Sequence, residues 1–377
     1  MAKKRLRHGY STGACAAAAA KGATMALLGA PVDEVSLKLP WKRETATFRS
    51  FKLVGLTKDT EVSSCGVIKD GGDDPDVTNG MEIRAAVSLI SGVKASSSGG
   101  FTVEIEGGEG VGRVTRKGLA AEVGSPAINP VPLEMIEESV REAVSLQKVD
   151  GISGVRVVIS APEGAERAKK TLNHRLGIVG GLSILGTTGI VIPMSAAAWE
   201  ATIDSCLDVA KAAGAKRMLL AFGRTSELAG HKLYPELAEN AAVLMGDHVG
   251  YSLDQTVKRD LDAVIVGQFA KFCKVAGGHY RTHVKDSSLD LTVLKELMEE
   301  AGFPPAEAKE ALKANTARQI YENLRETGDR GLFELLTCRV ARRAQERVEG
   351  AIAIETVLFG YKGEELARCS FERGASV

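Results

Sequence analysis

Residues 196–222 read AAAWEATIDSCLDVAKAAGAKRMLLAF, and this stretch decides the fold. Its first part, residues 196–213, is predicted to be a helix, and its end, residues 217–222, a short buried strand. Similar apolar runs predict strands at residues 155–160, 189–192, 241–245 and 263–266, and residues 253–260 predict a helix. This alternation predicts βαβ units and an open, mostly parallel sheet covered by helices. Such sheets bind ligands at the carboxyl ends of their strands.

The flanking regions follow other patterns. Three helices are predicted at residues 291–301, 306–326 and 332–349, followed by an alternating strand at residues 351–359. Before the α/β part, a helix is predicted at residues 14–28, strands at 35–39, 46–54 and 101–105, and a helix at 133–144. We therefore predict two domains: an N-terminal α+β domain of residues 1–150, and an α/β domain of residues 151–349 with a C-terminal helical segment. As an alternative, a strand within residues 350–377 returns to the first domain and joins it.

Composition narrows the function classes. The 377 residues carry 48 Lys and Arg against 48 Asp and Glu, and only 5% are aromatic. A protein that binds nucleic acid normally has a basic excess or aromatic stacking platforms, so no nucleic-acid partner is expected. No run approaches the roughly 18 apolar residues of a membrane span, so no membrane partner is expected. The 41 glycines are an excess that favours loops approaching a ligand closely.

The cysteines and the N-terminus favour the cytoplasm. The six cysteines are irregularly spaced and form no C-x-x-C pair, so neither a zinc ribbon nor a disulfide framework is predicted. The basic N-terminus and the alanine run at residues 16–20 imitate a secretory signal. That run is short, however, and Lys21-Gly22 interrupts it, so we predict a cytoplasmic protein.

Two glycine-rich segments are candidates for binding a nucleotide-like ligand. The first, EGGEGVG at residues 106–112, follows a predicted strand, so Glu106 would hold ribose hydroxyls and the amides of Gly108, Gly110 and Gly112 would approach the ligand. Residues 113–115 read as a strand rather than the helix such a loop requires, so a glycine-rich hairpin is the alternative. The second segment, GIVGGLSILGTTG at residues 177–189, presents amides and hydroxyls within the predicted α/β domain. Its candidate ligand-binding residues are Gly180, Gly181, Gly186, Thr187 and Thr188.

A third segment, KDGGDDPD at residues 69–76, concentrates carboxylates. Asp70, Asp73, Asp74 and Asp76 repel one another unless a cation, a lysine or a polar substrate is close. Crowding of this kind produces a general base, but a solvated turn is the alternative. The segment is not an EF-hand, because Pro75 stands where that loop needs glycine.

Two further segments carry weaker signals. GYSTG at residues 9–13 starts the first predicted helix, where Ser11 and Thr12 cap it or contribute to an anion site. His279 and His283 are four residues apart, but the glutamate of a zinc-protease motif is missing and two glycines precede them. We predict no protein metal site.

Taken together, the segments resemble one known family. GYSTGACAA from residue 9, KDGGDDPD from 69, GEGVG from 108, PAINPVP from 126 and GGLSILGTTGIV from 180 stand in the order found in the cobalt-precorrin-5B C1-methyltransferases (CbiD family) of anaerobic cobalamin biosynthesis. The resemblance covers residues 8 to about 285.

The resemblance implies an activity and its reactants. Members transfer a methyl group from S-adenosylmethionine to carbon C1 of cobalt-precorrin-5B, a cobalt-containing tetrapyrrole, giving cobalt-precorrin-6A. The cobalt would arrive within the substrate. On this reading Asp73 and Asp74 are catalytic candidates, and Ser11, Thr12, Lys69, Asp70 and Asp76 are candidates for substrate binding. The methyl donor is expected at residues 180–188, with residues 106–112 for donor or substrate.

Two other function classes remain open on the sequence. A nicotinamide-dependent oxidoreductase would use Glu106 and its glycines, and it requires a helix after Gly112. A non-catalytic tetrapyrrole carrier or scaffold would bind corrinoids and ignore the methyl donor. A homo-oligomer is also left open.

Overall fold

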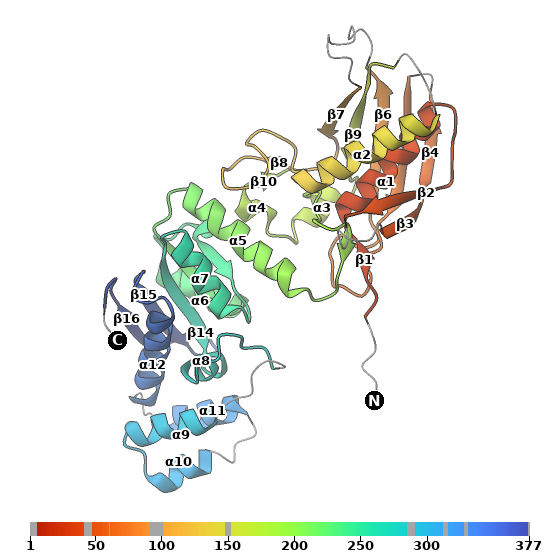
Figure 1. Cartoon of the computed structure of the whole chain (residues 1–377). Helices are drawn as coiled ribbons and strands as arrows, with labels where there is room; N and C mark the ends of the chain where they lie inside the picture. Colours follow the sequence, from red (N-terminus) through yellow and green to blue (C-terminus); the bar gives the residue numbers. More distant parts are fainter. Residues whose placement is uncertain are drawn as a thin grey trace. The chain divides into compact units, whose positions relative to one another are not determined.

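The computed structural model describes residues 6–40, 47–59, 61–90, 101–147, 152–284, 291–311, 316–327 and 331–375 (Figure 1). The chain divides into two compact units, unit 1 (Met1–Ser195) and unit 2 (Ala196–Val377).

Unit 1 is an α+β unit built on a five-stranded sheet. The strand order of this sheet is β4-β5-β6-β9-β7, and its neighbours are antiparallel except for the parallel pair β7 and β9. Smaller two-stranded sheets pair β1 with β11, β2 with β3, and β8 with β10. In chain order the elements are β1 (Gly9–Tyr10), α1 (Thr12–Leu27), β2 (Glu34–Leu39), β3 (Thr47–Lys52), β4 (Val54–Lys58), β5 (Val62–Ile68), β6 (Glu82–Leu89), β7 (Thr102–Gly107), β8 (Arg113–Val114), α2 (Pro130–Gln147), β9 (Gly154–Ser160), α3 (Gly164–Ala168), α4 (Asn173–Leu176), β10 (Ile178–Val179) and β11 (Ile190–Val191).

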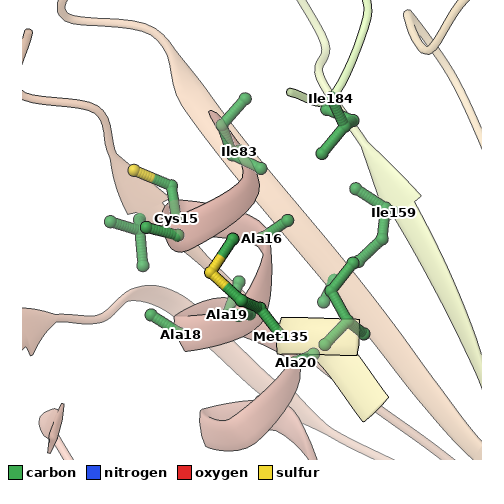
Figure 2. Close-up of a cluster of buried hydrophobic side chains, with 14 of the residues drawn as sticks. Cys15, Ala16, Ala18, Ala19, Ala20, Ile83, Met135, Ile159 and Ile184 are labelled. Atoms are coloured by element: carbon green, nitrogen blue, oxygen red, sulfur yellow. The ribbon is translucent and has the colours of Figure 1, made fainter. Parts of the chain in front are cut away.

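The alanine-rich helix α1 is the centre of the unit 1 core. It packs against β5, β6 and α2, and the side chains of Ala16 to Ala20 are fully buried with Ile83, Met135 and Ile159 (Figure 2). Helix α1 is buried on all sides, and alanine allows its neighbours to approach closely. A larger side chain at these positions would overpack the core. The alanine run is therefore a packing feature of the fold.

The boundary predicted near residue 150 is displaced to Ser195. Strand β9 has the apolar, buried pattern expected of a parallel strand, and it is parallel to β7. Its other neighbour is β6, to which it is antiparallel, so β9 belongs to the five-stranded sheet of unit 1. A strand buried on both faces has the same residue pattern in either sheet, so the sequence of β9 could not show which sheet it joins.

Unit 2 contains the open, mostly parallel sheet that the sequence predicts. The strand order is β13-β12-β14-β15-β16, with all neighbours parallel except β15 and β16. Strand β15 pairs with β14, so the late strand stays in this unit and does not return to the first domain. In chain order the elements are α5 (Ala196–Ala212), β12 (Arg217–Ala221), α6 (Arg224–Leu233), the 3-10 helix η1 (Glu239–Ala241), β13 (Ala242–Leu244), α7 (Val249–Lys258), β14 (Asp262–Gln268), α8 (Phe269–Ala276), α9 (Leu291–Glu300), α10 (Pro305–Ala311), α11 (Ala317–Thr327), α12 (Gly331–Arg347), β15 (Ile354–Phe359) and β16 (Glu365–Phe371).

The cysteines include one pair that the sequence did not predict. The irregular spacing predicted no disulfide framework, but one disulfide is present, joining Cys338 of α12 to Cys369 of β16, whose Cα atoms are 5.1 Å apart. Helix α12 packs on β16, which brings the two residues together. Cys15, Cys65, Cys206 and Cys273 are free and buried. Within the described part of the chain, no helix has the length and apolar character needed to cross a membrane.

Candidate functional site

Three of the predicted segments meet at the N-terminus of α1. Strand β1 pairs with β11, and the amide of Ser11 donates to the carbonyl of Gly189 (2.9 Å). The amide of Tyr10 donates to the carbonyl of Asp70 (2.7 Å). The GYSTG segment thus lies between the acidic segment and the second glycine-rich segment, so the tertiary structure assembles motifs that are far apart in the sequence.

Ser11 and Thr12 are used inside this assembly. Ser11 is the N-cap of α1, and its hydroxyl accepts from the amide of Ala14 (3.1 Å). The hydroxyl of Thr12 accepts from the amide of Leu185 (2.9 Å), and the amide of Gly13 donates to the carbonyl of Leu185 (3.0 Å). Both hydroxyl side chains are buried. The capping role is therefore the one seen, and the helix start donates to the chain itself.

A buried ion pair supports the acidic segment. The side chain of Lys69 is 1% exposed, and its Nζ donates to Oδ2 of Asp76 (2.5 Å). The other oxygen of Asp76 accepts from the amide (2.7 Å) and hydroxyl (2.6 Å) of Thr78. Burial by itself would raise the pKa of Asp76, but the bonds from Lys69 and Thr78 outweigh burial and lower that pKa. Lys69 thus relieves part of the crowding of carboxylates.

The other three carboxylates accept hydrogen bonds from Arg7 or Met194. The guanidinium of Arg7 bonds both oxygens of Asp70 and holds the pKa of Asp70 below its usual value. Oδ2 of Asp73 accepts from the amide of Arg7 (2.7 Å), and Oδ1 of Asp74 accepts from the amide of Met194 (2.9 Å). Asp73 is exposed and Asp74 half-buried. Each uses one carboxylate oxygen in these bonds, so this edge of unit 1 presents carboxylates to solvent.

A small hollow lies at strand β1, where the amide of Tyr10 donates to the carbonyl of Asp70. It is lined by His8, Gly9, Tyr10, Arg49 and Ile190. Arg49 comes from β3, and no motif in the sequence marked it. The hollow places a cation on the same edge as the acidic segment, which suits a substrate that carries both carboxylates and N–H groups.

The glycines of residues 106–112 serve close packing of the backbone. The amides of Gly108 and Gly112 donate to the carbonyls of Ile159 and Leu182 (2.8 Å each). At Gly110, where φ is +71°, an added Cβ would lie 1.8 Å from the carbonyl oxygen of Ala161. These glycines are therefore required where backbone meets backbone.

Strand β8 follows Gly112 directly, so the hairpin alternative is the one observed. The helix that the oxidoreductase hypothesis requires is not there, and that hypothesis loses its structural basis. The side chain of Glu106 is largely exposed and lies beside Arg156, with 3.6 Å between the charged atoms. Donor or substrate binding by this segment stays a prediction.

The second glycine-rich segment lies in unit 1, not beside the parallel sheet as predicted. Gly181 packs on the backbone of Gly110, and Gly186 lies against Ser11. Gly180 and Thr187 are exposed, and the hydroxyl of Thr188 bonds the backbone of Ile190. Donor binding was expected here because the segment was predicted to lie in the α/β domain, and its position in unit 1 removes that reason. Donor binding by this segment stays a prediction.

The two histidines do not share a helical face. His279 and His283 follow the end of α8, in irregular backbone. Across the described residues, no group of three or more His, Cys, Asp or Glu side chains is arranged to hold a metal ion.

Unit 2 has a polar cluster that the sequence did not indicate. Asp247 follows β13, and its Oδ1 accepts from the ammonium of Lys271 and the hydroxyl of Thr282 (2.5 Å). The buried ammonium of Lys274 donates to the carbonyl of Thr282 (2.8 Å). Burial would raise the pKa of Asp247, but the bonds from Lys271 and Thr282 outweigh it and lower that pKa. The three segments come together only through packing of α8 beside β14, so no local motif could reveal them.

Comparison with known proteins covers both units. A family model described as CbiD matches residues 1–193, and one described as CbiD, C-terminal domain, matches residues 281–370. The chain is 50% identical over 373 residues to a cobalt-precorrin-5B C(1)-methyltransferase of Geobacter metallireducens, covering 96% of this chain and 98% of the relative. It is 44% identical over 368 residues to the protein of the same name from Geobacillus kaustophilus, covering 97% and 95%.

One solved structure is also similar. It is a 1.9 Å crystal structure of a cobalamin biosynthesis protein (cbiD) from Archaeoglobus fulgidus, 28% identical, with a TM-score of 0.38 over 79% of this chain and 85% of that one. The family model and the near-complete coverage of the curated relatives decide the assignment. The chain belongs to the CbiD family.

Proposed function

We propose that this protein transfers a methyl group from S-adenosylmethionine to C1 of cobalt-precorrin-5B, giving cobalt-precorrin-6A. The observation that carries the proposal is 50% identity over nearly the full length of a relative that bears this name. The relatives' names give no support to an oxidoreductase or to a non-catalytic carrier.

The reaction makes modest chemical demands on the protein. S-adenosylmethionine supplies an electrophilic methyl group on a sulfonium. The C1–CH3 bond forms as the C–S bond breaks, and sulfur keeps the electron pair, which leaves S-adenosylhomocysteine. The protein contributes by aligning the two reactants and excluding water. A base is needed only where a pyrrole N–H proton is lost or must be oriented.

We assign binding of the tetrapyrrole substrate to the edge of unit 1 that carries the KDGGDDPD segment. Asp73 and Asp74 are the candidate groups for the pyrrole N–H, because each uses one carboxylate oxygen in the bonds described, whereas both oxygens of Asp76 are used by Lys69 and Thr78. The buried ion pair between Lys69 and Asp76 holds the two ends of the KDGGDDPD segment together. Arg49 and Arg7 suit the substrate's acetate and propionate carboxylates.

The remaining predicted contacts are more indirect. Ser11 and Thr12 act as positioning residues for the loop at residues 183–189. Asp70 acts through its ion pair with Arg7. We place the reaction in the cytoplasm, and size-exclusion chromatography with light scattering would show whether the protein is a homo-oligomer.

The test is a methylation assay under anaerobic conditions. Cobalt-precorrin-5B is incubated with S-adenosylmethionine carrying a 13C-labelled methyl group, and the product is examined by mass spectrometry and 13C NMR. We expect one added methyl group, located at C1, with one S-adenosylhomocysteine formed per product. A reaction without donor is the control. Methylation at another carbon, or turnover independent of the donor, would refute the proposal.

Asp73→Asn and Asp74→Asn locate the site in the same assay. A group that handles the pyrrole proton should lower kcat at least tenfold in its variant with little change in KM, because the loss acts on the transition state. Glu61→Gln, an exposed acidic residue outside the segment, is the matched control. Unchanged kinetics in both aspartate variants would remove them from the catalytic role.

A further inference from the structure

Strand β3 carries a charge on the face that otherwise packs inward. Arg49 and Phe51 are two positions apart, so they lie on the same face of β3. Their antiparallel partners on β2 are Leu37 and Val35. Phe51, Leu37 and Val35 are each at most 4% exposed, so this face belongs to the core. The alternation of an antiparallel strand predicts an apolar residue at position 49, and an arginine stands there instead.

Arg49 reaches the hollow at strand β1. The hollow has a volume of about 100 Å³, and its other lining residues are His8, Gly9, Tyr10 and Ile190. Arg49 is the residue of this lining that carries a permanent positive charge, because a guanidinium stays protonated in proteins. The exception to the apolar pattern of β3 therefore brings a cation to an opening in the surface of unit 1.

The wall of the hollow is fixed by packing on several sides. The ring of Tyr10 lies on the buried ring of Phe51, with 4.7 Å between their centroids. Tyr10 also pairs with Ile190 of β11. At Gly9 an added Cβ would lie 2.1 Å from the backbone of Gly71, so β1 and the acidic segment are in close contact. A wall held in this way is formed before a ligand arrives, and little ordering is needed on binding.

The volume decides which part of a ligand can enter. One water needs about 10–15 Å³ of such space, so the hollow holds a group the size of several waters. Sites that enclose a whole small molecule measure about 300–1,000 Å³. The macrocycle of a tetrapyrrole and the adenosyl donor are therefore too large for it. A short side arm of a larger molecule fits.

The chemistry of the lining selects an arm that ends in a carboxylate. A guanidinium presents N–H groups in a planar fork that matches the two oxygens of a carboxylate. The phenol of Tyr10 supplies an O–H donor, and Ile190 offers an apolar surface for the methylene groups of the arm. Acetate and propionate arms have this composition, with one or two methylene groups before the carboxylate.

We infer that this hollow binds one acetate or propionate arm of the tetrapyrrole, with the carboxylate of the arm on Arg49. The inference rests on the proposed function, which supplies a substrate with such arms. Arg7, whose amide donates to Asp73 (2.7 Å), is three positions before Tyr10, at most about 11 Å along an extended chain. One macrocycle is wide enough to contact both places. Arg49 is thus a residue that determines substrate orientation and specificity, away from the reacting atoms.

The test measures binding of a stable corrinoid to the full chain by calorimetry. Cobyrinic acid has free acetate and propionate carboxylates, and its methyl ester has the same ring with these charges removed. We expect the wild type to bind the acid at least tenfold more tightly than the ester. Arg49→Gln should raise the Kd for the acid at least tenfold and leave the Kd for the ester nearly unchanged, because a hydrogen bond between charged groups is lost.

Two variants on the same strand serve as controls. Lys52→Gln also removes a positive charge from β3, but position 52 is exposed and lies on the opposite face from Arg49, so binding should match the wild type. Arg49→Lys keeps the charge without the planar fork and should give an intermediate Kd. Thermal unfolding should give the same melting temperature for all of them, since the side chain of Arg49 is exposed.

Kinetics separate this subsite from the proposed function. In the anaerobic methylation assay, Arg49→Gln should raise the KM for cobalt-precorrin-5B at least tenfold, with kcat and the KM for S-adenosylmethionine unchanged. If the wild type binds acid and ester equally, or if Arg49→Gln and Lys52→Gln weaken binding alike, the subsite is overturned. If the wild type methylates C1 and Arg49→Gln keeps its KM, the subsite is overturned and the proposed function survives. If Arg49→Gln abolishes the preference for the acid but the wild type does not methylate C1, the subsite stands and the proposed function is overturned.

Discussion

The N-termini of α1 and α6 look alike in principle and differ in use. In α1 the cap is Ser11, and the amides of Gly13 and Ala14 donate to Leu185 and Ser11 of the same chain. In α6 the cap is Gly223, and the first amides meet no described acceptor. The motif-rich end is closed by the chain, and the motif-poor end is open. The density of motifs at the start of α1 therefore reflects how tightly these segments pack against one another.

The largest expected effect compares a glycine of unit 1 that packs against backbone with the glycine before α6, which meets no neighbouring atom. Gly110→Ala should lower the free energy of unfolding by about 4 kcal/mol, because a left-handed φ and a backbone clash add up. Gly223→Ala should change it by less than about 0.5 kcal/mol, as at an ordinary surface position. Urea unfolding followed by circular dichroism measures both. If both variants lost the same free energy of unfolding, Gly110 and Gly223 would not differ in their packing as the structure indicates.

The two aspartate–lysine pairs sharpen the comparison. Asp76→Asn leaves Lys69 buried without its partner and should cost about 3 kcal/mol. Asp247→Asn should cost about 1 kcal/mol, because the side chain of Lys271 is 34% exposed and can be solvated. Urea unfolding at pH 7 provides both values. A larger loss for Asp247→Asn would show that the unit 2 cluster, rather than the unit 1 pair, carries the structural role.

The loss in Asp76→Asn should also depend on pH. The folded-state pKa of Asp76 is lowered, so its stabilisation is complete above the unfolded value near 3.9 and is lost as pH falls through the lower folded value. The gap in unfolding free energy between wild type and variant should be constant from about pH 5 to 7 and narrow below about pH 4. A gap that stays constant down to pH 2 would contradict the ion pair as its source.

The smallest effect concerns the caps themselves. Ser11→Ala removes the acceptor for the amide of Ala14 and should cost about 1 kcal/mol, whereas Ser11→Thr keeps a hydroxyl and should cost less. Gly223→Ser adds a cap to α6 and should not destabilise unit 2. Thermal unfolding of the three variants compares them directly. A loss on adding the cap at residue 223 would indicate that the start of α6 is already satisfied within the chain.

Several features of the fold could be predicted because they are local. The alternation around residues 196–222 predicted α5, β12 and the parallel sheet, since short apolar strands and helices leave periodic signals. The capping role of Ser11 was one of two readings weighed, because an N-cap depends on adjacent residues. The family resemblance implied that the GYSTG, KDGGDDPD and second glycine-rich segments serve one reaction, but that they meet at the start of α1 is seen only in the structure.

Other features depended on contacts between distant residues. Strand β9 belongs to the sheet of unit 1 because it pairs with β6 and β7. The sequence of its seven residues does not specify which strands it pairs with. Cys338 and Cys369 are 31 positions apart, and they meet because α12 packs on β16. The indole of Trp199 lies against Gly246, the residue before Asp247, for the same kind of reason. Sequence by itself determined the local elements and the family, while the tertiary structure alone decided strand partners, the disulfide and which helix start is open, because long-range packing leaves no periodic pattern in the chain.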